Sequence, residues 1–278
     1  MLNTVGQTTK FINIVSKIFT CVSAVCIMHQ RFSIKHIWYI RKMIISHSKK
    51  FIFVKTVKTG GTSLESYLSA FCDVQDVITP IYPAIERHYP RNHRGWFNFV
   101  RGLSDARELR ISGISWLFTD FLRRRKFSNH LSGRQIRARV GHNVWRDYFT
   151  FCVERNPWDK TLSHYHMLAA RSNKPLSLDA YFAAGKFPVN VGMYTNRDGA
   201  LIVDRVLRFE RLGEELVEVG VRLGLPLERN VPKVGKVDYR SDRRHYTEIL
   251  STKQIDQIAR VFAAEITLHG YEVESPKP

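Results

Sequence analysis

Apolar runs alternate with helical patterns along this chain and divide it into three strand-turn-helix units. Each unit begins with a short β-rich run, breaks at a turn and continues with apolar residues at helical spacing. The predicted strands and their helices are residues 51–57 and 62–72, 149–154 and 158–170, and 205–209 and 212–223. Strands that alternate with helices predict an α/β fold with a parallel sheet covered on both faces.

The segments outside these units have weaker or different patterns. Residues 73–126 contain prolines and many basic side chains, which predicts an insertion with some helix. Residues 131–140 have helical spacing, and residues 251–269 carry an apolar stripe that ends at Gly270. We therefore expect a helix before the second unit and a long amphipathic helix packed on the core near the end of the chain.

The first 42 residues form an N-terminal extension before a domain of residues 43–278. They contain an apolar run from Phe11 to Met28, which Lys17 interrupts and basic residues flank. Three interpretations compete: a translation start at Met43, a short membrane anchor, and a secretory signal, which fits worst because no clear cleavage site follows. Membrane contact is expected only through residues 1–42, and the domain is otherwise expected in the cytoplasm.

The amino-acid composition favours negatively charged partners but does not identify which class of them the protein binds. The 278 residues include 43 Lys and Arg against 25 Asp and Glu, a formal net charge of +18. Such a surplus favours polyanions, which include nucleotides, acidic glycans, nucleic acids and anionic lipids. The four cysteines have neither metal-ligand spacing nor the number needed for a disulfide framework, which favours a reducing compartment and no metal site. They are Cys21, Cys26, Cys72 and Cys152.

The turn of the first unit is suited to binding an anion. It consists of Lys58, Thr59, Gly60, Gly61, Thr62 and Ser63. A helix N-terminus follows, where free N–H groups favour negative charge, and glycines let a phosphate approach the backbone. Thr62 and Glu65 also have the spacing of a capping box. The lysine precedes the glycines, unlike the nucleoside-triphosphatase loop, so the pattern counts against an ATPase or kinase.

The turn of the second unit adds another anion-binding element. Arg155 ends the strand, Pro157 is well placed at the first helical position, and Ser163 lies on the helix. The arginine offers a planar fork and the serine a hydroxyl to one phosphate group. Two such turns at neighbouring strand ends suit a nucleotide that carries two separate phosphates.

Both turns, in this order and separation, resemble the PAPS-dependent sulfotransferase family, and in particular bacterial relatives of the carbohydrate sulfotransferases. PAPS is 3′-phosphoadenosine 5′-phosphosulfate. The resemblance extends over about residues 43–273. It implies a three-layer P-loop-like fold, a central parallel sheet flanked by helices, and sulfuryl transfer from PAPS to a hydroxyl or amine acceptor such as a carbohydrate. It further implies that Lys58 to Ser63 hold the 5′-phosphosulfate and that Arg155 and Ser163 hold the 3′-phosphate.

Sulfuryl transfer requires a side chain that neutralises charge on the leaving nucleotide and a side chain that deprotonates the acceptor. Lys58 is the candidate that neutralises charge on the leaving nucleotide. His130 is the candidate general base, since histidine titrates near neutral pH and the segment from His130 to Arg137 resembles one near the family's acceptor. Glu65 is the rival base, and His142, His164 and His166 are weaker candidates. No metal is expected to be required.

Two other function classes remain open. A P-loop-like kinase or NTPase is the alternative enzyme, and Mg²⁺ dependence would distinguish it. A basic nucleic-acid-binding protein without catalysis is the alternative from another class, although the two turns would then be unnecessary. Among the basic residues, 123–126 are a candidate glycan-binding patch, and Arg240, Arg243 and Arg244 are candidates for closing over the nucleotide.

Overall fold

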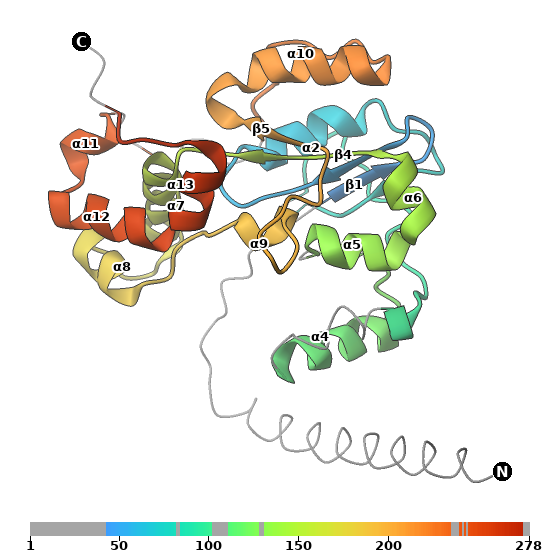
Figure 1. The fold of residues 1–278 in the computed structure, drawn as a ribbon, viewed down its shortest axis with the longest axis horizontal. Coiled ribbons are helices and arrows are strands. Elements are labelled where there is room, and N and C mark those ends of the chain that lie inside the picture. Colours follow the sequence, from blue (N-terminus) through green and yellow to red (C-terminus); the bar gives the residue numbers. More distant parts are fainter. Residues whose placement is uncertain are drawn as a thin grey trace, which may run out of the picture.

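A mixed five-stranded sheet lies at the centre of the computed structural model, in the order β3-β1-β2-β4-β5 (Figure 1). The strands are β1 (Met43–Ser46), β2 (Phe51–Val54), β3 (Val77–Ile78), β4 (Phe149–Glu154) and β5 (Arg205–Arg208). Strands β2, β4 and β5 run parallel, whereas β1 is antiparallel to both β2 and β3. The expectation of an all-parallel sheet is therefore wrong, because a tight turn after β1 reverses the chain. The structure describes residues 43–81, 84–101, 111–127, 131–234, 239–240, 242 and 244–274.

Helices cover both faces of the sheet and extend beyond one end of it (Figure 1). They are α2 (Gly61–Ser69), α4 (Ile111–Leu122), α5 (Gly133–Val140), α6 (His142–Asp147), α7 (Pro157–Arg171), α8 (Leu178–Ala184), α9 (Val191–Tyr194), α10 (Leu212–Leu223), α11 (Tyr246–Ile249), α12 (Thr252–Val261) and α13 (Ala263–His269). A 3₁₀ turn, η1 (Phe209–Arg211), joins β5 to α10. The three-layer α/β arrangement expected from the sequence is present.

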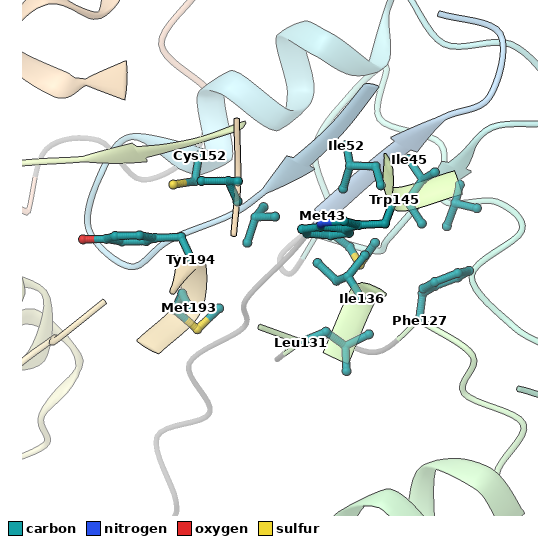
Figure 2. Close-up of a cluster of buried hydrophobic side chains, with 13 residues drawn as sticks. Met43, Ile45, Ile52, Phe127, Leu131, Ile136, Trp145, Cys152, Met193 and Tyr194 are labelled. Atoms are coloured by element: carbon teal, nitrogen blue, oxygen red, sulfur yellow. The ribbon is translucent and has the colours of Figure 1, made fainter. Parts of the chain in front are cut away.

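Alternate residues of the strands feed two separate cores, as the period of two requires. On one face, Phe51 and Phe53 pack with α2 and α10 through Leu64 and Leu216. The opposite face uses the intervening strand positions together with α5, α6 and α9, and Figure 2 shows this cluster, which includes Met43, Ile45, Ile52, Ile136, Trp145 and Met193. Burial on both faces explains why these strands have apolar runs rather than an alternating pattern.

A third core joins the helices that lie beside the sheet. Trp158 of α7 and Tyr246 of α11 stack with ring centroids 5.9 Å apart. Trp158 also donates from Nε1 to the carbonyl of Ile255 at 3.2 Å. Phe262 is fully buried and separates α12 from α13, so the single helix expected over residues 251–269 is two helices.

Most of the predicted units are confirmed, with changes at their ends. Strand β4 has the predicted bounds, and α7 begins at Pro157 as expected. The first strand ends at Val54 rather than at residue 57, which leaves Lys55 in the following loop. The predicted capping box is wrong, because α2 begins after Gly60 and has no side-chain cap. Strands β1 and β3 were not predicted.

Within the described residues, no helix has both the length and the apolar character needed to cross a bilayer. The apolar run from Phe11 to Met28 lies outside the described residues.

Candidate active site

Three loops meet at the edge of the sheet where the parallel strands end. Strands β2 and β4 are neighbours, so the turns that follow them emerge side by side. Arg155 donates from Nη1 to the carbonyl of Lys58 at 3.4 Å. Its guanidinium lies 4.3 Å from the ring centroid of Phe209, which follows β5. The prediction that the two turns lie at adjacent strand ends is confirmed.

Backbone conformation and close packing explain the two glycines of the first turn. Lys58 and Gly60 both have left-handed backbones, with φ of 63° and 70°. A Cβ atom on Gly60 would lie 2.8 Å from the Phe209 ring, and one on Gly61 would lie 2.7 Å from Cγ of Lys55. Contacts this short are not tolerated, so the turn can pack against both side chains only with glycine at these positions.

The hydroxyl groups of the first turn all have partners inside the protein. Thr59 is buried, and its Oγ1 lies 2.8 Å from Oγ1 of Thr56. Thr62 accepts from Nζ of Lys55 at 2.9 Å. Ser63 accepts from the backbone N–H of Val234 at 3.0 Å. These bonds hold the turn in place. The charged side chain of the turn is Lys58.

Lys55 and Glu65 form a buried ion pair beneath the turn. Lys55 Nζ lies 3.1 Å from Oε2 of Glu65, and Oε1 of Glu65 accepts from Oγ1 of Thr79 at 3.1 Å. Burial lowers the pKa of Lys55, and the neighbouring Glu65 opposes that shift. Sequence reasoning missed Lys55, since it was assigned to a strand. Glu65, the rival base, has no exposed surface and is held by these partners.

Lys58 belongs to a group of cations at the strand ends. Burial, with Arg155 and then Arg171, lowers the pKa of Lys58 to about 8. Its ammonium lies 5.9 Å from the ring centroid of Tyr239, and the guanidinium of Arg171 lies 5.6 Å from the same ring. In the part of the chain that the structure describes, no carboxylate forms an ion pair with Lys58. An anion bound here would relieve the repulsion among these cations.

A carboxylate occupies part of the Arg155 fork. Oδ2 of Asp159 accepts from Nε of Arg155 at 2.9 Å and also from its Nη2, while Oδ1 accepts from Arg240. Burial acts to raise the pKa of Asp159, but the two arginines outweigh it and hold that pKa below its usual range. Arg240 therefore lies at the second turn, and its expected closing over the nucleotide stays a prediction. Arg243 lies outside the described residues, and Arg244 pairs with Asp242.

Helix α7 carries two further polar side chains in register with Asp159. Ser163 is one turn on and half-buried, and His166 follows three residues later. Burial and the nearby charges of Arg240 and Lys58 lower the pKa of His166, and Asp242 opposes this. The buried Nε2 of His166 has no hydrogen-bond partner among the residues that the structure describes. This histidine, a weaker candidate in the sequence, therefore lies close to the cation group.

The other candidate histidines have different surroundings. His164 is buried, contacts the Tyr181 hydroxyl at 2.8 Å, and has a pKa lowered to about 4 by burial. His142 is exposed at the start of α6. His130, the predicted general base, lies outside the described residues, directly before Leu131 of the core.

A second charged cluster lies behind the site and is fully buried. Nζ of Lys160 lies 2.7 Å from both Glu154 Oε1 and Glu265 Oε2. Glu154 Oε2 also accepts from the Tyr194 hydroxyl at 3.0 Å. Burial and Glu154 raise the pKa of Glu265, which is consistent with two carboxylates sharing one cation. This Glu154–Lys160–Glu265 cluster was not predicted.

Asn190 connects that cluster to the first turn. Its Oδ1 accepts from the N–H of Val57 at 2.9 Å, and its Nδ2 donates to the carbonyl of Val57 at 3.0 Å. The same Nδ2 lies 3.3 Å from Oε1 of Glu154, and the Asn190 N–H donates to Glu265. The residue before Lys58 is therefore held on both backbone groups by one buried amide.

Comparison with known proteins adds a relative and a structural neighbour. No family model matches the chain. It is 35% identical over 102 residues to an uncharacterized protein of Archaeoglobus fulgidus, covering 34% of this chain and 84% of the archaeal one. The chain therefore belongs to the same family as that protein, whose description states no activity.

A crystal structure of a sulfotransferase from Alicyclobacillus acidocaldarius aligns with 81% of this chain and 96% of its own, at 18% identity and a TM-score of 0.35. A likeness at that TM-score carries no argument about this chain.

Proposed function

We propose that this protein is a sulfotransferase that moves a sulfuryl group from PAPS to a hydroxyl or amine of an acceptor, with a carbohydrate as the expected class. The observation that carries the proposal is that Lys58 and Arg155, both cations, lie next to each other at adjacent strand ends. Lys58 is a cation without an ion-pair partner among the described residues, and burial, with Arg155 and then Arg171, lowers its pKa. The choice of PAPS as the donor rests on the resemblance of residues 58–63, and of Arg155 with Ser163, to the donor-binding motifs of the sulfotransferase family.

The charges at the site fit a donor with two phosphate groups. Asp159 pairs with Arg155 and Arg240, whereas Arg155 and Arg171 lie near Lys58 without a carboxylate paired to that lysine among the described residues. The guanidinium of Arg155 already binds Asp159, so a 3′-phosphate on Arg155 would lie beside that carboxylate. The positive charge of Arg240 would offset the repulsion between the phosphate and Asp159. Ser163 lies one helical turn from Asp159 and offers a hydroxyl to the same phosphate.

The chain's own groups divide the work of the reaction. Lys58 neutralises charge on the bridging oxygen of the departing nucleotide, and the N–H groups at the start of α2 bind the phosphosulfate. Arg155 anchors the donor before and during the reaction. His130 takes the proton of the acceptor hydroxyl or amine, and Glu65 is the rival for that role. Burial beside Lys55 favours a supporting role for Glu65.

The base assignment is tested by comparing His130→Ala with Glu65→Gln in a sulfuryl-transfer assay with labelled donor. His130→Ala should lower turnover by about 10²- to 10⁴-fold, the usual contribution of a positioned base. Binding of the product nucleotide, 3′-phosphoadenosine 5′-phosphate, should be nearly unchanged. Normal turnover in His130→Ala, with abolished turnover in a folded Glu65→Gln, would move the base to Glu65.

A kinase or NTPase is the alternative, and the effect of a chelator on transfer from each donor, PAPS or ATP, separates the two. The described residues include no group of three or more His, Cys, Asp or Glu side chains arranged to hold a metal ion. We expect sulfuryl transfer to continue in the presence of a chelator. Phosphate transfer from ATP that stops on chelation would support the alternative. Retention on DNA without nucleotide binding would instead favour the nucleic-acid-binding class.

A further inference from the structure

Two segments of the insertion pack against each other and form a unit at the edge of the molecule. The carbonyl of Arg124 accepts from the N–H of Gly95 at 2.8 Å, and that of His93 accepts from the N–H of Phe127 at 2.9 Å. The rings of Trp96 and Phe121 lie 4.7 Å apart. Figure 1 shows helix α4, which ends in this unit, at the periphery beyond α5.

The surface of this unit combines exposed apolar and basic side chains. Trp96, Val100 and Leu122 are 51%, 74% and 60% exposed. Exposed arginines accompany them at positions 94, 123, 124 and 125, and the guanidinium of Arg124 lies 5.0 Å from the Trp96 ring centroid. We call these seven residues the basic–apolar surface.

Negative charge is nearly absent from the two segments. Within residues 91–101 and 117–127 the sequence contains one acid, Asp120. It is buried and paired with Arg139 at 3.1 Å, so its charge is already compensated. Among the described residues, no carboxylate forms an ion pair with the arginines of the basic–apolar surface, so they present a positive field to the solvent.

We propose that the basic–apolar surface docks on an anionic lipid bilayer. Arginines near such a bilayer gain from its negative potential, and exposed tryptophan and aliphatic side chains gain by entering the interface. An acidic glycan or a nucleic acid would satisfy the arginines but would leave Val100 and Leu122 in water. This docking is independent of the proposed sulfotransferase activity, and it assigns membrane contact to a part of the chain other than residues 1–42.

The first test measures flotation of the full chain with vesicles of neutral lipid, with and without an anionic phospholipid. Wild type should bind only the anionic vesicles. Replacing Arg123, Arg124 and Arg125 by Gln should weaken binding about 10²-fold, since each arginine near the surface contributes about a fivefold factor. The matched control replaces the exposed Lys174, Lys186 and Lys253 by Gln and should bind like wild type. Residues 1–42 are present in every variant, so their contribution cancels.

The second test separates a bilayer from a soluble polyanion. Val100→Ser with Leu122→Ser should weaken vesicle binding about tenfold, since two exposed aliphatic side chains no longer enter the interface. The same pair should leave binding to dextran sulfate unchanged. Val221→Ser with Val261→Ser, at exposed sites on α10 and α12, is the control. Absence of vesicle binding, or vesicle binding unchanged in the arginine or the serine variant, would overturn the proposal.

Discussion

Lys58 follows strand β2, and Lys160 lies on helix α7, which follows the neighbouring strand β4. The charges that surround the two lysines are nevertheless opposite. Lys160 is fully buried and bonded to two carboxylates, Glu154 and Glu265, at 2.7 Å each. Lys58 is half-buried, lies near Arg155 and Arg171, and has no ion-pair partner among the described residues. The charge of Lys160 is satisfied inside the protein, whereas the charge of Lys58 would be satisfied by an anion that the protein binds. We infer that Lys160 supports the fold and that Lys58 serves the proposed sulfuryl transfer.

The largest expected effect is on folding and comes from Lys160→Met. This change leaves two buried carboxylates without their cation, which should lower the free energy of unfolding by about 3–5 kcal/mol. Urea denaturation followed by circular dichroism measures it, with the exposed Lys174→Met expected to stay within about 0.5 kcal/mol of wild type. An unchanged midpoint for Lys160→Met would show that the buried cluster contributes little to stability.

Lys58→Ala should have the converse effect. Turnover should fall by about 10²- to 10³-fold, because the charge that Lys58 stabilises is greatest in the transition state. The free energy of unfolding should not fall, since Lys58 stands among like charges. The assignment fails if Lys58→Ala turns over normally, or if its lost activity is matched by a loss of stability like that of Lys160→Met.

Asn190→Ala tests the connection between the two lysines. Removing the amide frees both backbone groups of Val57, so the turn that carries Lys58 loses its anchor. We expect kcat to fall by up to about 10²-fold, the effect of a misplacement of about 1 Å. The KM for the donor should change less, because the guanidinium of Arg155 is held mainly by Asp159. A loss of stability with normal kcat in the remaining folded protein would limit Asn190 to a structural role.

The sequence predicted the parallel part of the sheet better than its antiparallel edge. The apolar runs that form β2, β4 and β5 are each followed by a helical pattern. This alternation along the chain is typical of a parallel sheet. Strand β1 has only four residues, directly after a basic and apolar extension, and nothing in its pattern shows that the chain reverses after it. The split of the last helix at Phe262 was equally hidden, because the apolar stripe continues through it.

The site shows the same division between local and distant information. Lys58 and Arg155 could be predicted because each belongs to a contiguous motif. Lys160 and Glu265 are 105 residues apart, and Asn190 reaches Val57 across 133 residues, so no spacing in the sequence indicates these contacts. Lys55 was missed for a different reason: a single polar residue at the end of an apolar run is indistinguishable from a strand residue until its partner Glu65 is placed.

Calorimetric titration with 3′-phosphoadenosine 5′-phosphate and with AMP measures whether the site recognises a second phosphate. We expect the bisphosphate to bind about 10- to 150-fold more tightly, since a charged hydrogen bond from arginine to the second phosphate contributes about 1.5–3 kcal/mol. Arg155→Ala should remove most of that preference while leaving AMP binding nearly unchanged. Equal affinity of the wild-type protein for both nucleotides would contradict the sulfotransferase assignment.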